Sequence, residues 1–162
     1  MKYTFASPPP LRPLRDARFE MPDNRNNQLI KKIPMTREEL NRLSHEVIDI
    51  AIIVHKRLGP GLLESIYRKV LTYELNKRGY KAVMEVPMNC IYDGIDMGLA
   101  YRADIIVEDE LIIEVKSTQE NHPVFFMQLL SYLKVADKRL GLLLNFSYPV
   151  LTDGMKRIVH RF

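Results

Sequence analysis

Three charged side chains stand out because they fall in two short apolar segments. Asp104 lies in segment 102–107, and Glu114 and Lys116 lie in segment 111–116, with only three acidic residues between the segments. Such a short polar break predicts a β-hairpin. Because strand side chains alternate between the two faces of a sheet, Glu114 and Lys116 point the same way, and the hairpin brings Asp104 toward them.

Two carboxylates and an ammonium group on a rigid sheet suit metal-dependent cleavage of a phosphodiester bond. Carboxylate oxygens hold Mg²⁺, which polarises the phosphate and activates water. Lys116 could offset charge on the scissile phosphate or help to deprotonate the water. The alternative is that these charges form only the solvated face of a half-exposed sheet. The apolar residues around them argue against it, because ionised groups in buried strands are costly unless they are paired or bind metal.

Two helices are predicted before these strands. Thr36-Arg37-Glu38-Glu39 forms a capping box, and apolar residues at helical spacing continue to Leu58, where Gly59-Pro60-Gly61 ends the helix. A second helix is expected from about Leu62 to Arg78. Its inward-facing residues are expected to be Leu63, Ile66, Tyr67, Val70, Leu71 and Leu75.

Further strands and one more helix complete the predicted order. Asp93-Gly94 predicts a tight turn, and Pro123 opens a helix that continues to about Val135. The two hairpin strands are expected at 100–107 and 111–116, and the other strands at 83–88, 90–92, 139–145 and 155–159. The predicted order is therefore helix, helix, strands, helix and strand, with no internal repeat.

The net charge of +4 is confined to one end of the chain. Residues 1–35 hold seven Lys or Arg and three acidic residues, and residues 36–162 hold 17 of each sign. The prolines of 1–35 predict a disordered or loosely attached basic tail that folding does not need, with Met35 as an alternative start. Residues 36–162 are expected to form one domain, in which only a local patch could favour nucleic acid.

The distribution of apolar residues and cysteine bears on the cellular setting. No apolar run is long enough to cross a bilayer, and prolines and arginines interrupt the first residues where a signal segment would lie. Cys90 is the single cysteine, so neither a disulfide framework nor a thiolate zinc site is expected. We therefore expect a cytoplasmic protein with no membrane partner.

Three more residues are candidates for the site. Glu64 lies in the first turn of the second predicted helix, where it either interacts with the helix dipole or points inward. Gln128 and Tyr132 are four residues apart and share a helix face. The alternative for this pair is the polar edge of an amphipathic helix.

These residues together resemble a known family. The segment from Gly61 to Tyr67 resembles the G-x-x-E-x-x-Y motif of the GxxExxY proteins, which belong to the PD-(D/E)XK nuclease superfamily. Asp104, the Glu114-Val115-Lys116 strand and the Gln128–Tyr132 helix resemble that superfamily's acidic strand, E-x-K strand and Q-x-x-x-Y helix. The resemblance runs in matching order from 36 to 159, with alanine at 103 where the superfamily's name has proline.

The resemblance implies a fold and a set of roles. The fold would be a restriction-endonuclease-like α/β core, with a central mixed β-sheet flanked by helices and two N-terminal helices. Mg²⁺, or Mn²⁺, would be held by Glu64, Asp104, Glu114 and the carbonyl of Val115. Lys116 would be the catalytic lysine, and Gln128 and Tyr132 would orient Lys116 or the phosphate.

Two hypotheses about function follow. The first is a Mg²⁺-dependent nuclease that hydrolyses phosphodiester bonds of DNA by metal-activated water, and the intact set of charged residues favours it. The second is a catalytically idle nuclease-like module that binds nucleic acid or a protein. The neutral domain and the lack of an attached DNA-binding domain favour the second, or an enzyme that relies on a protein partner. A homo-oligomer is compatible with either.

Overall fold

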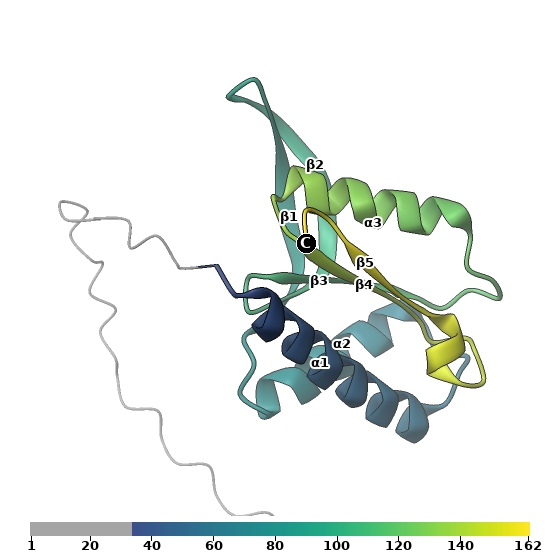
Figure 1. Cartoon of the computed structure of the whole chain (residues 1–162). Coiled ribbons are helices and arrows are strands. Elements are labelled where there is room, and N and C mark those ends of the chain that lie inside the picture. The colour runs from purple at the N-terminus through teal and green to yellow at the C-terminus, as the bar shows by residue number, and fades with distance from the viewer. Residues whose placement is uncertain (1–33) are drawn as a thin grey trace, which may run out of the picture. The chain divides into compact units, whose positions relative to one another are not determined.

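The computed structural model describes residues 34–162, so the predicted tail lies outside the described part except for its last two residues. Five strands form one mixed sheet with helices on both faces, which confirms the predicted fold class (Figure 1). The elements are α1 (Arg37–Leu58), α2 (Glu64–Lys77), β1 (Ala82–Tyr92), β2 (Ile95–Val107), β3 (Leu111–Lys116), α3 (Pro123–Val135), β4 (Leu140–Asn145), a 3-10 turn η1 (Leu151–Gly154) and β5 (Met155–Val159).

The strands lie in the sheet in chain order. The pairs β1–β2, β2–β3 and β4–β5 are antiparallel, and β3–β4 is parallel. Helix α3 makes the crossover that a parallel pair requires. The predicted hairpin around Asp104 and Glu114 is confirmed, because Ile105 pairs with Ile113 and Val107 pairs with Leu111.

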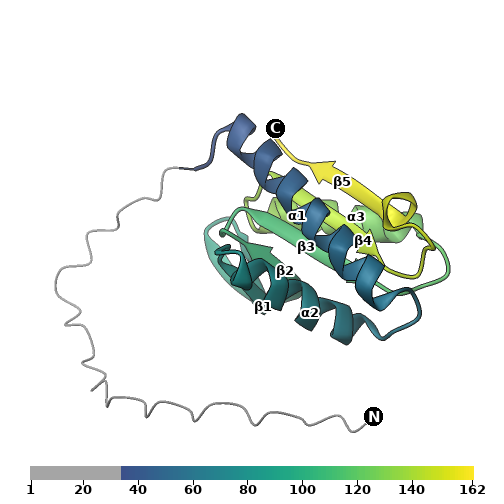
Figure 2. The same cartoon turned by 90° about the horizontal axis from the view of Figure 1, so that it is seen from below.

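The two faces of the sheet are covered by different helices. Helices α1 and α2 cover one face and α3 covers the other (Figure 2). Helix α1 begins at the predicted capping box, in which the Glu39 amide donates to the Thr36 hydroxyl at 3.2 Å and the Thr36 amide donates to Glu39 at 2.7 Å. On the other face, α3 approaches β4 so closely that a Cβ at Gly141 would lie 3.0 Å from Leu129 Cγ.

Helix α2 is shorter than predicted. It begins at Glu64 rather than Leu62, with Leu63 as its N-cap residue. The expected inward placement of Leu63 and Ile66 is wrong, since their side chains are 74% and 38% exposed. Tyr67 is buried as predicted. The exposed leucine precedes the first helical turn, so helical periodicity does not determine its direction.

Strands β1 and β2 are longer than predicted and form an arm that extends past the rest of the sheet (Figure 1). The predicted turn at Asp93 and Gly94 is confirmed, with φ values of 50° and 77° that a two-residue hairpin turn requires. All residues from 91 to 100 are exposed. Within residues 34–162, no helix combines the length and apolar character needed to cross a membrane.

Candidate active site

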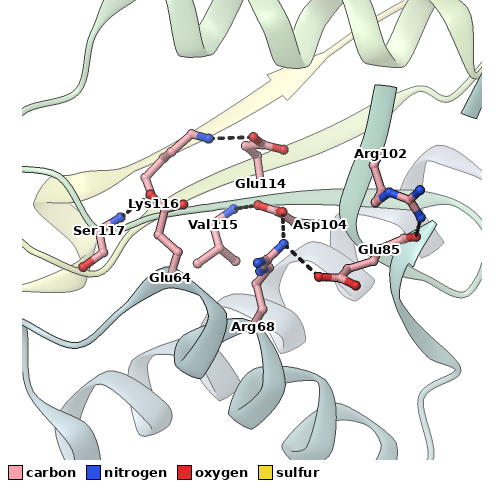
Figure 3. A network of polar contacts seen from close by, with 9 residues as sticks. All are labelled: Glu64, Arg68, Glu85, Arg102, Asp104, Glu114, Val115, Lys116 and Ser117. Atoms are coloured by element: carbon pink, nitrogen blue, oxygen red, sulfur yellow. Dashed lines mark hydrogen bonds and ion pairs between the residues drawn. The ribbon is translucent and has the colours of Figure 1, made fainter. Parts of the chain in front are cut away.

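Asp104 and Val115 join β2 to β3 at the point where their regular ladder stops. Ile105 and Ile113 form the last ladder pair on this side. Beyond that pair, the Val115 amide donates to Oδ2 of Asp104 at 2.9 Å (Figure 3). The carboxylate therefore takes the place of a backbone acceptor and is held beside Glu114.

A break in the side-chain alternation of β2 sets the direction of Asp104. Ala103 packs on the α3 side of the sheet, whereas Ile105, two residues later, packs on the α1 and α2 side. Regular strands place such residues on one face. Glu85, opposite Asp104 on β1, has φ of 53°, so both strands are irregular at this level. The break allows Asp104 to reach α2, where Arg68 Nη1 donates to Oδ1 at 2.8 Å.

Glu114 and Lys116 form an ion pair on the α3 side of β3. Lys116 Nζ donates to Oε1 of Glu114 at 2.8 Å and lies 5.1 Å from the centre of the Phe125 ring on α3. This contact confirms that the two side chains share a face. Burial, together with the charge of Asp104, raises the pKa of Glu114 even though Lys116 opposes the shift. Burial alone would lower the pKa of Lys116, but the hydrogen bond to Glu114 and the negative charges of Glu114, Glu64 and Asp104 together outweigh it, and the pKa is raised.

Glu64 reaches the end of β3 from the first turn of α2. Its Oε1 accepts a hydrogen bond from the Ser117 amide at 3.0 Å, and Ser117 directly follows the strand (Figure 3). The charge of Glu64 is also felt at Glu114, where it contributes to the raised pKa. Three carboxylates from α2, β2 and β3 therefore converge on one end of the sheet.

Tyr67, the last residue of the G-x-x-E-x-x-Y segment, fixes the loop before α2. Its hydroxyl donates to the Gly59 carbonyl at 2.7 Å and accepts from the Leu62 amide at 3.1 Å. The ring is fully buried and stacks on Phe146 with centroids 4.3 Å apart. The motif thus works as a unit, because the tyrosine holds the turn that sets where Glu64 begins the helix.

Asn145 holds the loop that follows Lys116, and the sequence analysis did not identify it. Its fully buried side chain accepts from the amides of Thr118 and Ser147 and donates to Thr118 and Asn121. Its backbone pairs with Lys116 in the parallel ladder. A polar residue at the end of the apolar strand 140–145 was the available signal.

The two residues predicted on α3 are placed differently from each other. Gln128 is exposed, and within residues 34–162 its side chain has no hydrogen-bond partner. The Tyr132 ring stacks on Tyr101 with centroids 3.8 Å apart, and the Tyr101 hydroxyl donates to the Tyr132 carbonyl at 3.0 Å. Burial, with the nearby Tyr132 and Glu114, raises the pKa of Tyr101 to about 12. The role predicted for Gln128 and Tyr132 in orienting Lys116 remains a prediction.

The donor set determines whether a metal ion suits this site. In residues 34–162, no three His, Cys, Asp or Glu side chains are close enough to form a ready-made metal cluster. Each carboxylate instead contacts an internal cation or amide, namely Arg68, Lys116 or Ser117. The donors are all hard oxygens; burial raises the pKa of Glu114, and the negative charges of Asp104 and Glu64 add to that shift. Charge and donor type therefore fit a divalent ion such as Mg²⁺ or Mn²⁺. To bind it, Asp104 and Glu114 would have to release their contacts with Arg68 and Lys116.

An open depression lies beside Glu64. It has a volume of about 540 Å³ and is lined by Gly61, Leu62, Leu63, Glu64, Ser65, Ser117 and Ser147. A second depression, of about 650 Å³, adjoins it at Ser117. Both are open to solvent and neither encloses a small ligand in the manner of a buried pocket. The open surface next to Glu64 and Ser117 can therefore accept an extended molecule.

Comparison with known proteins bears on the same residues. No curated protein and no solved structure gave a significant match. A family model described as PD-(D/E)XK nuclease superfamily matches residues 41–158, a span that includes Glu64, Asp104, Glu114 and Lys116. This span covers well over half of the chain and nearly all of the sheet and its helices. The chain therefore belongs to the PD-(D/E)XK nuclease superfamily.

Proposed function

We propose that this protein is a divalent-metal-dependent nuclease of the GxxExxY type that hydrolyses phosphodiester bonds of DNA. The observation that carries the proposal is the meeting of Glu64, Asp104, Glu114 and Lys116 at one end of β3. Superfamily membership supports nuclease activity in general. The arrangement of Gly61, Glu64 and Tyr67 around the start of α2 supports the narrower assignment.

The chain offers oxygen ligands for the ion from three elements. Glu64, Asp104, Glu114 and the carbonyl of Val115 would hold it. When bound, a divalent ion would polarise a phosphodiester and lower the pKa of a water molecule. Overall, water adds across a phosphorus–oxygen bond, leaving a phosphate monoester on one fragment and a hydroxyl on the other.

Lys116 would act on the substrate rather than on the ion. Its ammonium group is held at the end of β3 by Glu114 and by the face of Phe125, with 17% of the side chain exposed. An ammonium group in that position can stabilise the negative charge that develops on the phosphate oxygens. Ser117 and Asn145 would keep the end of the strand in place by anchoring the loop that follows.

A second candidate function is a catalytically idle module that binds nucleic acid or a protein. The observation in its favour is that Arg68 and Lys116 already balance Asp104 and Glu114. Because each of these two carboxylates is paired with a cation, the site could keep its structure without a bound metal ion. The neutral charge of residues 36–162 also weakens nonspecific attraction to nucleic acid.

Cleavage assays separate the two functions. Wild-type protein, Lys116→Ala and the control Lys134→Ala, which removes an exposed lysine from α3, are incubated with labelled single-stranded DNA, duplex DNA and RNA in Mg²⁺, Mn²⁺ or EDTA. The nuclease proposal predicts metal-dependent cleavage of DNA by wild type and Lys134→Ala and none by Lys116→Ala. No cleavage of any substrate by wild type would favour the idle module.

A further inference from the structure

Arg68, which neither the motif nor the sequence spacing singled out, lies between two carboxylates at the edge of the site. It lies on α2 four residues after Glu64. Its Nη1 is 2.8 Å from Oδ1 of Asp104 and 3.6 Å from Oε1 of Glu85 (Figure 3). One nitrogen thus faces both acids, with the shorter contact on Asp104.

The two acids differ in exposure and therefore in how firmly they can hold a cation. The Asp104 side chain is 14% exposed, the Arg68 side chain 22% and the Glu85 side chain 58%. Ion pairs weaken as solvent screens them, so Asp104 is the stronger partner and Glu85 the weaker one. Within residues 34–162, Arg68 contacts both acids through the same nitrogen, Nη1.

The backbone of β1 is shaped to present Glu85 to Arg68. Glu85 has φ of 53°, a left-handed conformation that strains a residue with a side chain. Met84 and Val86 on either side of it pack toward opposite faces of the sheet, so the strand is broken there as β2 is at Asp104. Arg102 holds this break by donating to the Glu85 carbonyl at 3.2 Å (Figure 3). A strained residue opposite the half-buried Asp104 is a feature that is concentrated at functional sites.

The contact on Asp104 places Arg68 in competition with a divalent ion. Oδ1 of Asp104 accepts from Arg68, and Oδ2 is already bonded to the Val115 amide. An ion that used Oδ1 would need that oxygen and would also repel the adjacent guanidinium. Glu85 offers a second acceptor within a small side-chain movement, because Nη1 is already 3.6 Å from it.

We propose that Arg68 is a further functional residue of the site, which leaves Asp104 for Glu85 when a divalent ion binds and then holds a phosphate of the nucleic acid beside that ion. The inference rests on the proposed metal-dependent nuclease function and adds to it a residue outside the motifs. In the metal-free protein Arg68 balances the charge of Asp104. In the metal-bound protein its planar group of donors faces the substrate, a geometry that suits a phosphate.

Metal affinity gives the first test. Mn²⁺ is titrated calorimetrically into wild type, Arg68→Met, Glu85→Gln and Arg78→Met. The last is the control, since it removes the same charge from the end of α2 and breaks the Arg78–Glu74 pair away from the site. Arg68→Met is expected to bind Mn²⁺ roughly fivefold more tightly, because a competing cation is lost. Glu85→Gln is expected to bind it more weakly, because Arg68 then has no charged alternative. Arg78→Met is expected to match wild type.

Nucleic-acid affinity gives the second test, in which Arg68→Met is expected to weaken binding rather than to tighten it. A fluorescent single-stranded DNA oligonucleotide is titrated in Mn²⁺ against Lys116→Ala, alone and combined with Arg68→Met or Arg78→Met. Adding Arg68→Met is expected to weaken DNA binding severalfold, and adding Arg78→Met is expected to leave it unchanged. A residue with a purely structural role would not tighten metal binding while it weakened DNA binding.

The outcomes separate this inference from the function on which it rests. Wild type that binds Mn²⁺ while Arg68→Met binds it equally or more weakly would overturn the inference and leave the metal site intact. Unchanged DNA binding on addition of Arg68→Met would overturn the phosphate-binding role. Wild type that binds no Mn²⁺ would overturn the metal site itself. If Arg68→Met does not fold, Glu85→Gln carries the test, because this side chain is more than half exposed. Equal Mn²⁺ affinity in Glu85→Gln and wild type would then refute the exchange.

Discussion

Lys116 Nζ lies 2.8 Å from Oε1 of Glu114, and these two side chains share a face of a strand that is otherwise apolar and buried. Contact with Lys116 lowers the pKa of Glu114, but burial and the charge of Asp104 raise it by more, so the pKa lies above its ordinary value. The ionised carboxylate therefore destabilises the metal-free fold. Such a cost is typical of a functional residue and makes a direct prediction about stability.

Glu114→Gln is expected to raise the free energy of unfolding at pH 7 in EDTA. A raised pKa means that the folded protein binds the proton more tightly than the unfolded chain, whose value is near 4.5. Wild-type stability therefore falls as the pH rises through the folded-state pKa, and the substitution removes that loss. The gain should shrink as the pH is lowered from the folded-state pKa toward 4.5 and should be absent below 4.5.

Urea unfolding at several pH values measures this effect. The control is Glu120→Gln, which removes a charge from an exposed position on the loop after β3. A wild-type protein that is more stable than Glu114→Gln at pH 7 would show instead that the ion pair with Lys116 dominates, and that Glu114 has a structural role.

Tyr67→Phe is expected to destabilise the protein by about 1–2 kcal/mol, because the Gly59 carbonyl and the Leu62 amide lose their shared partner. It should also weaken metal binding, since the loop that sets the position of Glu64 loosens. Tyr73→Phe serves as the control, because that ring lies on the same helix and is 61% exposed. Thermal unfolding with and without Mn²⁺ reports both effects, and equal melting temperatures for the two variants would contradict the role given to Tyr67.

Gln128→Ala and Tyr132→Phe are expected to reduce DNA cleavage less than Lys116→Ala does. The exposed Gln128 should leave the melting temperature unchanged, because its side chain has no partner within residues 34–162. Tyr132→Phe keeps the ring that stacks on Tyr101 and should also unfold like wild type. Initial cleavage rates measure the loss. If Gln128→Ala is as inactive as Lys116→Ala, the minor role predicted here for Gln128 is wrong.

Removal of residues 1–34 is expected to leave the melting temperature unchanged. Met35 stays attached to the domain, because its amide donates to Glu110 at 3.4 Å and its carbonyl accepts from Arg139. The truncated chain would lose the excess positive charge, so any DNA affinity that the tail provides should fall, together with its dependence on salt. Differential scanning calorimetry and salt-dependent anisotropy test the two parts, and a drop of several degrees would show that the removed segment packs on the domain.

The sequence predicted those parts of the fold whose signals are local. The capping box at Thr36 and the apolar run 111–116 were each sufficient to place an element. The first part of β2, residues 95–99, was missed because these residues are exposed and lack the pattern of a buried strand. Leu63 was misplaced because helical spacing was extended past the first turn of α2.

The candidate site was predictable to a similar extent. Asp104, Glu114 and Lys116 were predicted because they lie in two apolar segments joined by a short break, and alternation placed Glu114 and Lys116 on one face. The role of Glu64 was predicted from the resemblance of its segment to a known motif. Arg68 was not found, since its contact with Asp104 depends on a break in two strands that no spacing rule describes. Asn145 was missed for a related reason: its partners lie on a loop whose path is set only in the folded chain.

Calorimetric titration of Mn²⁺ into wild type, Glu114→Ala and Lys116→Ala tests the central claim most directly, namely that the carboxylates at the end of β3 bind a divalent ion. The expected result is saturable binding to wild type, nearly equal affinity in Lys116→Ala because the lysine is not a ligand, and loss of binding in Glu114→Ala. Absence of binding to wild type, or equal binding to wild type and Glu114→Ala, would contradict the claim.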